Sequence, residues 1–239
     1  MDDNRQRNSE AVDAWILEAA EKGIHLQSGI IGNKVLYDLC KQYFDHSNDD
    51  AINAKIWLIG RAYAASIERR RTKGDKINDD FYAEKVVKEM RDAELDKRLT
   101  KLRAYSSINK ANIAEILGVH RYLLDKFKKI SDLNKRSLAS KYLHFHLPHL
   151  FFIYDSRANN ALRRISEKPG EDFDDIIDSP TVDKAYAAFF YRAYQLRERI
   201  GKDMTPRHFD NMLIMIENEK MRGQKTKNNI SEGAVTDSV

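Results

Sequence analysis

The fold of this chain is decided by residues 137–165, whose sequence is SLASKYLHFHLPHLFFIYDSRANNALRRI. Residues 137–146 read as a helix, and the apolar and aromatic run 150–154 reads as extended chain, the one candidate strand in the sequence. Asp155 then opens a second helix, where free backbone N–H groups and the helix dipole both favour a carboxylate. This stretch therefore predicts two helices joined by a short extended segment.

The composition on either side of this stretch predicts an all-α or nearly all-α protein. Only 10 glycines and 4 prolines interrupt the 239 residues, so long helices are expected, with at most one short extended segment. We predict one multi-helix domain over 9–223, either undivided or split into two lobes, 9–105 and 106–223, with a cleft between them. The polar ends, 1–8 and 224–239, have few apolar residues and are expected to be disordered.

Apolar periodicity and capping residues predict where the helices begin and end. Ser179-Pro180 and Thr205-Pro206 each pair an N-cap residue with a proline suited to the first helical position, and Gly201 is a helix terminator. In the N-terminal half, Ser9 and either Asn48 or Asp49 are the expected N-caps. The helices expected there are 9–23, 34–44, one from 48 or 49 to about 73, one from 79 or 80 to 105, 109–117 and 119–130.

The composition excludes several classes of protein. The single cysteine, Cys40, rules out an internal disulfide, a four-cysteine zinc site and a cysteine-ligated iron–sulfur cluster. The chain has no run of 18 apolar residues and no apolar signal region, so we expect a cytoplasmic location and no membrane partner. His144 and His146 would lie about 200° apart around a helix. A metal triad with His149 is therefore disfavoured, and we expect neither a metal nor another cofactor.

Residues 130–165 resemble the helix–hairpin–helix DNA glycosylase superfamily. In that family a hairpin leads into a helix whose first turn carries Lys in bifunctional members and Ser in the adenine-specific mismatch branch. A catalytic Asp begins another helix about eighteen residues later, after an apolar run. Here Ser137 and Asp155 have that separation, 151–154 is the apolar run, and Leu162 with Arg163-Arg164 follows at the family's helix spacing.

The chain departs from the family pattern at three points. Asp132 and Asn134 stand near the hairpin positions where the family usually has glycines that approach a DNA phosphate. The cluster cysteines of the mismatch branch are absent. Position 137 holds no attacking Lys, so Lys141, one helical turn later, or Lys135, two residues earlier, would have to replace it.

The resemblance implies a base-excision mechanism and a set of site residues. Asp155 would stabilise the positive charge that develops on the sugar when the glycosidic bond breaks, with Ser137 and Lys141 beside it, and Lys141 would be the amine of a Schiff-base lyase step. The flipped base would stack on Tyr154 and Phe145. Duplex DNA with an abnormal base is the expected partner. The residues expected to contact DNA are Asn134, Lys135, Arg136, Arg157 and Arg164.

Two other functions remain open at this point. The altered hairpin and the missing Lys at position 137 favour a non-catalytic DNA-binding or regulatory descendant of the same fold. The near balance of 41 basic and 37 acidic residues allows a helical protein-interaction module with no nucleic-acid role. Asp155 would then be an ordinary helix N-cap.

Overall fold

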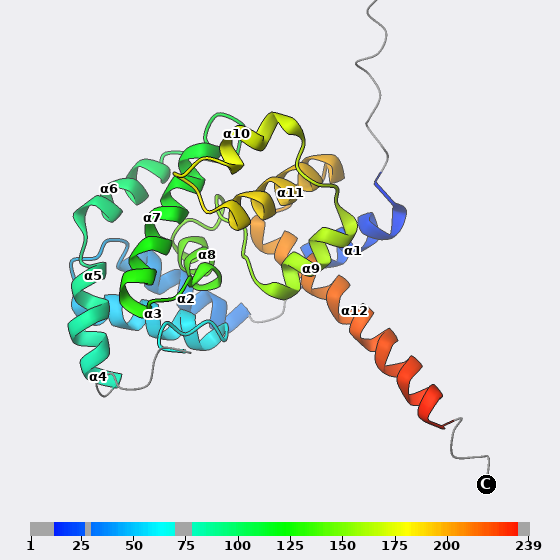
Figure 1. The fold of residues 1–239 in the computed structure, drawn as a ribbon, viewed down its shortest axis with the longest axis horizontal. Coiled ribbons are helices and arrows are strands. Elements are labelled where there is room, and N and C mark those ends of the chain that lie inside the picture. Colours follow the sequence, from blue (N-terminus) through cyan, green and yellow to red (C-terminus); the bar gives the residue numbers. More distant parts are fainter. Residues whose placement is uncertain (1–11, 27–29, 70–77, 234–239) are drawn as a thin grey trace, which may run out of the picture.

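The computed structural model describes residues 12–26, 30–69 and 78–233 (Figure 1). Of the described residues, 71% are helical and none belongs to a strand, which confirms the all-α prediction. The expected extended segment is present as residues 151–155, which belong to neither a helix nor a strand. The predicted helix cap Ser9 and the expected flexible segment 1–8 lie outside the described residues.

Three helices form the N-terminal part: α1 (Ala14–His25), α2 (Ile30–Gln42) and α3 (Asp49–Ala62). The prediction that Asn48 opens α3 is correct, because its side chain accepts a hydrogen bond of 2.8 Å from the backbone N–H of Ala51. The helix was expected to continue to about residue 73, but it ends at Ala62. Ala64 has a positive φ of 50°, so the backbone turns away from the helix axis there.

The charged segment that was predicted as one helix to residue 105 is interrupted. It consists of α4 (Asn78–Phe81), a π-helical turn η1 (Tyr82–Val87), α5 (Lys88–Met90) and α6 (Ala93–Leu102). Asp92 causes the last interruption, because its extended backbone and its carboxylate, which accepts from the Glu94 N–H, cap α6. Conversely, the two short helices predicted after it are one helix, α7 (Ile113–Ser131).

The C-terminal part begins with α8 (Arg136–His146) and α9 (Ser156–Ile165), which match the two helices predicted around Asp155. The short η2 (Glu171–Phe173) and α10 (Asp174–Ile177) lead to α11 (Lys184–Ile200) and α12 (Pro206–Gly233). Gly201 ends α11 with φ 67°, as predicted.

Of the two cap-proline pairs, one was predicted correctly. Thr205 accepts a hydrogen bond from the His208 N–H and Pro206 begins α12. Ser179-Pro180 does not begin a helix. The Ser179 hydroxyl bonds to that of Thr181, and α11 starts later, where Asp183 accepts from the Tyr186 N–H.

The prediction that residues 224–239 are disordered is wrong for residues 224–233, which belong to α12. This helix continues to Gly233, well beyond the expected start of disorder at 224. Residues 224–233 contain no proline, and their only glycine is the last residue, so nothing in them prevents a helix from propagating. In Figure 1 the far part of α12 extends beyond the rest of the protein. Residues 234–239 lie outside the described residues.

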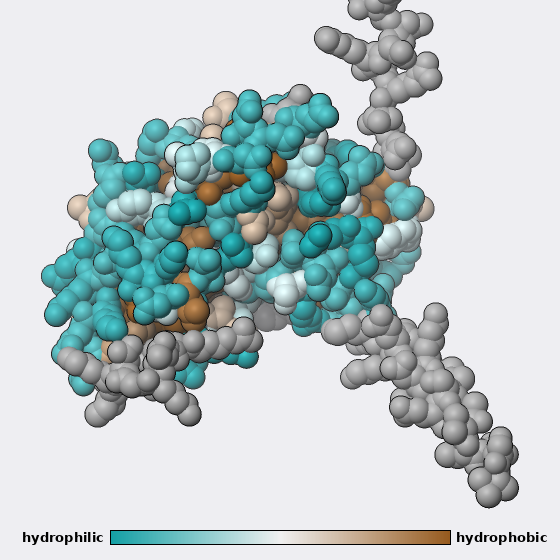
Figure 2. All heavy atoms as spheres, in the orientation of Figure 1, coloured by the Kyte–Doolittle hydropathy of each residue, from teal (hydrophilic) through white to brown (hydrophobic). Residues whose placement is uncertain are grey.

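Helix α8 lies at the centre of the fold (Figure 1), and every residue from Leu138 to His146 is buried. It contacts α2, α3 and α7, while α12 packs on α1 and α9. One hydrophobic cluster includes buried residues from both predicted lobes, such as Ile56 and Tyr142. The outer surface is largely hydrophilic, with small apolar areas between polar ones (Figure 2). Within the described part of the chain, no helix combines the length and the apolar character needed to cross a membrane.

Candidate functional site

The structure brings Ser137, Lys141 and Asp155 together. Ser137 and Lys141 lie one turn apart on the same face of α8, and the Lys141 Nζ donates a hydrogen bond of 2.7 Å to Ser137 Oγ. Asp155 is the residue before α9, and its Oδ2 lies 3.4 Å from Lys141 Nζ. The chain crosses from α8 to α9 through the extended segment, and Tyr154 N–H donates to Ser140 Oγ, which fixes that segment against α8.

Asp155 uses its two carboxylate oxygens differently. Oδ1 accepts the N–H of Ala158 at 2.9 Å, so it caps α9, as the sequence predicted. Oδ2 faces Lys141, and the side chain is 30% exposed. One oxygen therefore holds the helix start, while the other belongs to a partly open ion pair.

Lys141 is almost fully buried, with 1% of its surface exposed. Burial lowers the pKa of its ammonium group below the ordinary value, and the nearby Arg207 lowers it further, while Asp155 and Asp210 act in the opposite direction. The Nζ also lies 5.7 Å from the centre of the Tyr63 ring. An amine in such surroundings gives up its proton more readily than a surface lysine does.

These side chains line a pocket of about 540 Å³. Its walls are the start of α8, the start of α9, the turn between α7 and α8, and the segment that follows α3. Asp132 in that turn adopts a left-handed backbone with φ 57°, a conformation that glycine adopts most easily. The lining residues are 63–66, Arg69, 133–135, Ser137, Leu138, Lys141 and 154–157.

A second hollow of similar size, about 510 Å³, lies between α11 and the loop that follows α9. It contains none of the site residues predicted from the sequence. We therefore define the candidate site by the contacts among Ser137, Lys141 and Asp155 rather than by the volume of a cavity.

Two of the five predicted DNA-contacting residues, Lys135 and Arg136, are held by partners inside the protein. Lys135 Nζ donates to the backbone oxygens of Ser66 and Arg69, at 3.1 and 2.6 Å. Arg136 makes a two-pronged ion pair with Asp183, including a contact of 2.8 Å between Nη2 and Oδ2. These contacts hold the segment after α3 and the start of α11 in place.

The other three predicted DNA contacts differ in their surroundings. Arg164 pairs with Glu217 of α12 at 2.5 Å and does not line the pocket. Arg157 and Asn134 are exposed and line the pocket, and the Arg157 guanidinium donates to the side-chain oxygen of Asn218. Arg157 and Asn134 are thus the members of the predicted set that best face an incoming ligand.

The two predicted base-stacking residues are not equivalent. Tyr154 is half-buried and lines the pocket, with Phe189 packed at 5.1 Å from its ring centre. Phe145 is only 2% exposed and packs between the rings of Tyr37 and Tyr63, at 4.8 and 5.6 Å. We correct its role: Phe145 is a core residue, because the apolar face of α8 that holds it is covered by other helices.

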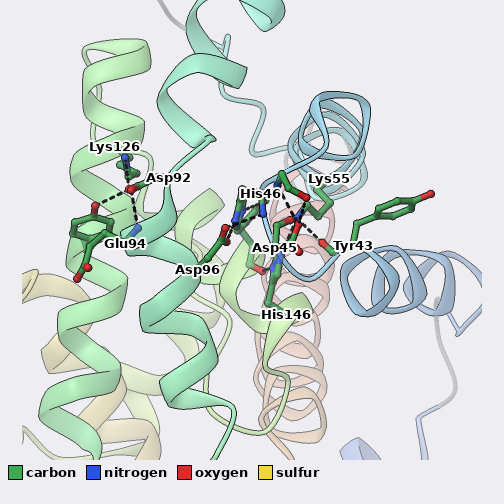
Figure 3. Close-up of polar contacts among 12 residues, drawn as sticks. Tyr43, Asp45, His46, Lys55, Asp92, Glu94, Asp96, Lys126 and His146 are labelled. Carbon is green, nitrogen blue, oxygen red and sulfur yellow. Dashed lines mark hydrogen bonds and ion pairs between the residues drawn. The ribbon is translucent and has the colours of Figure 1, made fainter.

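The three neighbouring histidines do not meet at one point. His144 Nδ1 donates to the oxygen of Phe151, His146 Nδ1 to that of Tyr142, and His149 Nε2 to that of Tyr105. Burial lowers the pKa of His144 and of His146 well below the ordinary value, so both rings are neutral. In Figure 3, His146 lies near Lys55 and His46, in a cluster around the end of α2. Each histidine ring therefore binds a different backbone oxygen.

Three further residues beside the site were not predicted: Tyr63, Arg207 and Asp210. Arg207 Nη1 lies 3.2 Å from Asp210 Oδ2, and Asp210 is buried in the first turns of α12. A signal was available in the sequence, because an Arg and an Asp three residues apart, just after the Thr205-Pro206 cap, must share one helix face. The segment was interpreted only from its cap and its apolar residues, such as Phe209, so the Arg207–Asp210 pair was missed.

No protein-family model, curated protein or solved structure matches this chain. The resemblance to helix–hairpin–helix glycosylases thus depends on residues 130–165 alone.

Proposed function

We propose that this protein binds duplex DNA and excises an abnormal base, with Asp155 as the catalytic carboxylate. One observation carries the proposal. A buried lysine, Lys141, bonds to Ser137 and lies 3.4 Å from Asp155 at a pocket, so the three residues expected at the catalytic site lie together. Titratable groups with perturbed surroundings in a pocket are more common at functional sites than elsewhere.

The chemistry follows from the positions of the charges. Breaking the bond between a base and its sugar leaves positive charge on the sugar, and a carboxylate close to the anomeric carbon stabilises that charge. Asp155 Oδ1 is held by the helix start, so Oδ2 is the oxygen that can approach the sugar or accept a proton from an attacking water. The side chain of Tyr154 and the exposed Arg157 stand at the same pocket to contact the base and a phosphate.

Lys141 would add a second step to this reaction. Its neutral amine would attack the C1′ aldehyde of the abasic sugar, and loss of one water would leave an iminium that permits strand cleavage. Burial of Lys141 supports this step because it favours the neutral form. The contact with Asp155 opposes it, so the balance between the two decides whether the protein is a pure glycosylase or also a lyase.

A non-catalytic DNA-binding descendant is the second candidate. The observation that favours it is the exposed Asp132 in the hairpin turn, where the family has a glycine that approaches phosphate. A carboxylate there repels a phosphate. Lys135 and Arg136, on the other side of the turn, are engaged with protein partners.

A protein-interaction module is supported by exposed apolar residues on α2 and α3. Ile31 and Val35 lie one turn apart on α2 and are 82% and 55% exposed, and Trp57 of α3 is 47% exposed. Apolar residues gathered on a surface often contact a partner protein.

The deciding experiment is excision from a panel of duplexes that carry oxidised, deaminated, alkylated or mismatched bases. Products are read with and without alkali, so that abasic sites are seen even if the strand is not cut. Asp155→Asn serves as the matched inactive variant. Excision that disappears in this variant supports the proposal. If wild type excises nothing but binds duplex DNA, the second candidate is favoured, and if it does not bind at low salt, the interaction module is.

A further inference from the structure

Asp210 is a buried carboxylate that the mechanism above does not use. It is 7% exposed, and only its Oδ2 has a hydrogen-bond partner, Arg207 Nη1 at 3.2 Å. Its Oδ1 has none among the described residues. A buried carboxylate oxygen without a hydrogen bond is costly, so helix packing alone does not account for an Asp at this position.

The ring of Tyr63 links Asp210 to the candidate site. The Lys141 ammonium lies 5.7 Å from the ring centre, and the Arg207 guanidinium lies 5.6 Å from the same point. Two cations therefore approach one ring that lines the site pocket. Arg207 is fixed there because its Nε donates to the Tyr37 hydroxyl, which in turn bonds to His144 Nε2.

The charges of Asp155, Arg207 and Asp210 shift the pKa of Lys141, and those of Asp155, Arg207 and Lys141 shift the pKa of Asp210. Asp155 and Asp210 both favour the charged form of Lys141, whereas Arg207 disfavours it. Burial raises the pKa of Asp210 to about 6, with Asp155 adding to the rise and Arg207 and Lys141 opposing it. The other titratable groups at this point are Tyr37 and Tyr63, whose pKa values burial raises, and His144, which is neutral.

We propose that Asp210 is a positioning residue of this site, whose carboxylate offsets Arg207 and so keeps Lys141 in its ammonium form beside Asp155. Lys141, Arg207, Asp155 and Asp210 then form one cluster with no net charge. The catalytic meaning of this role rests on the proposed function. The charge coupling itself needs no DNA, because all four groups belong to the folded protein.

In this role Asp210 would set the balance between base excision through Asp155 and imine formation by Lys141. With its carboxylate present, Lys141 stays protonated and donates to Asp155 and Ser137. Without it, Asp155 alone offsets the repulsion from Arg207, and the amine loses its proton at lower pH. Asp210 would then favour base excision through Asp155 over imine formation by Lys141.

The direct test is the titration of Lys141 in the full-length protein, followed by NMR of ¹³Cε-labelled lysine. The Lys141 signal is assigned by its loss in Lys141→Arg. In Asp210→Asn we expect the pKa of Lys141 to fall by about one unit, as for loss of a nearby opposite charge. Asp178→Asn is the matched control, because it removes an exposed carboxylate that pairs with Lys184 instead.

Arg207→Gln gives an independent reading should Asp210→Asn fail to fold. Removing the opposing cation should raise the pKa of Lys141. A folded Asp210→Asn protein with an unchanged Lys141 titration overturns the proposal, and so does an Arg207→Gln protein in which that pKa is unchanged or lower.

A second readout separates this proposal from the proposed function. Borohydride trapping of an abasic duplex, relative to total base excision, should increase several-fold in Asp210→Asn because more Lys141 is neutral. A wild-type protein that neither excises nor binds would refute the proposed function. The lysine titration would still decide whether Asp210 controls Lys141.

Discussion

Lys141 Nζ of α8 lies 3.4 Å from Oδ2 of Asp155, the N-cap of α9, although a segment with no helix separates the two residues in the chain. The same Asp155 side chain caps α9 through its other oxygen. Capping and ion pairing therefore depend on one carboxylate, and mutations must be chosen to separate them.

Asp155→Asn separates the cap from the charge. The amide oxygen can still accept the Ala158 N–H, and Asn and Asp cap helices about equally well, so the contribution of the cap to the unfolding free energy should change by less than about 0.5 kcal/mol. Any larger loss of stability would come from the ion pair with Lys141. Base excision should fall by about a hundredfold or more, in line with loss of one electrostatic stabiliser. Asp155→Ala should lose activity and also about 1 kcal/mol of stability. Single-turnover excision and urea unfolding check both, and an Asn variant of full activity would reduce Asp155 to a cap.

Lys141→Met tests the proposed amine. Methionine keeps an unbranched apolar side chain in the buried space but removes the nitrogen, so borohydride trapping should be abolished. We expect unfolding free energy to change by less than about 1.5 kcal/mol, because the variant also avoids the cost of burying an ammonium group. Lys184→Met, at an exposed ion pair, is the control. Trapping that persists in Lys141→Met would identify another amine.

Arg157→Glu tests the DNA surface at the residue that is exposed beside the pocket. If Arg157 contacts a phosphate, affinity should fall for every duplex sequence, and the slope of log K against log salt should flatten by about one unit. Fluorescence anisotropy over a salt series measures this. Arg121→Glu, on an exposed i,i+4 pair of α7, is the comparison. Equal losses in both variants would indicate general charge attraction rather than a contact.

Arg136 was expected to bind DNA, but in the structure it pairs with Asp183, so its substitution should lower the unfolding free energy. Arg136→Gln leaves the Asp183 carboxylate, 10% exposed, without its cation at the start of α11. We expect a loss of about 3 kcal/mol in unfolding free energy, as for a broken buried ion pair. Chemical denaturation monitored by circular dichroism measures it. A variant of wild-type stability with weakened DNA binding would restore the original assignment of Arg136.

The pH dependence of stability should report Asp210. Its pKa is about 6 in the folded protein and about 3.8 when unfolded, so the folded state holds the proton more tightly. This contribution is fully present below pH 4 and is lost as the pH rises through 6. It amounts to about 3 kcal/mol at most. The stability of wild type relative to Asp210→Asn should therefore decline from pH 4 to pH 7 in parallel urea titrations. A constant difference would show that Asp210 is not buried as described.

The sequence correctly predicted the helix ends that are set by local capping and terminating residues. The capping residues Asn48 and Asp155, the terminator Gly201 and the Thr205-Pro206 pair act on backbone groups within three residues of themselves, so their effects can be read from spacing. The meeting of Ser137, Lys141 and Asp155 was also predictable, because the two helices that carry them are consecutive.

Features that depend on distant residues were not predictable in the same way. The break at Asp92 involves Lys126 and Tyr122 of α7, which bind its carboxylate from thirty or more residues along the chain. Arg136 was predicted as a DNA-contacting cation because no local pattern shows its ion pair with Asp183, which lies 47 residues later in the chain. Burial of Phe145 likewise follows from the packing of α2 and α3 on α8 and from no pattern within α8 itself.

The packing of α12 on both α1 and α9 has a consequence for protein synthesis. Arg207 takes its place beside the Tyr63 ring, with Asp210 bound to it, only after α12 has left the ribosome, because the chain emerges from its N-terminus. Until then Lys141 and Asp155 are without two of the charges around them, and α1 is without the helix that covers it. The set of charges around Lys141 and Asp155 is thus complete only when nearly the whole of this sequence has been translated.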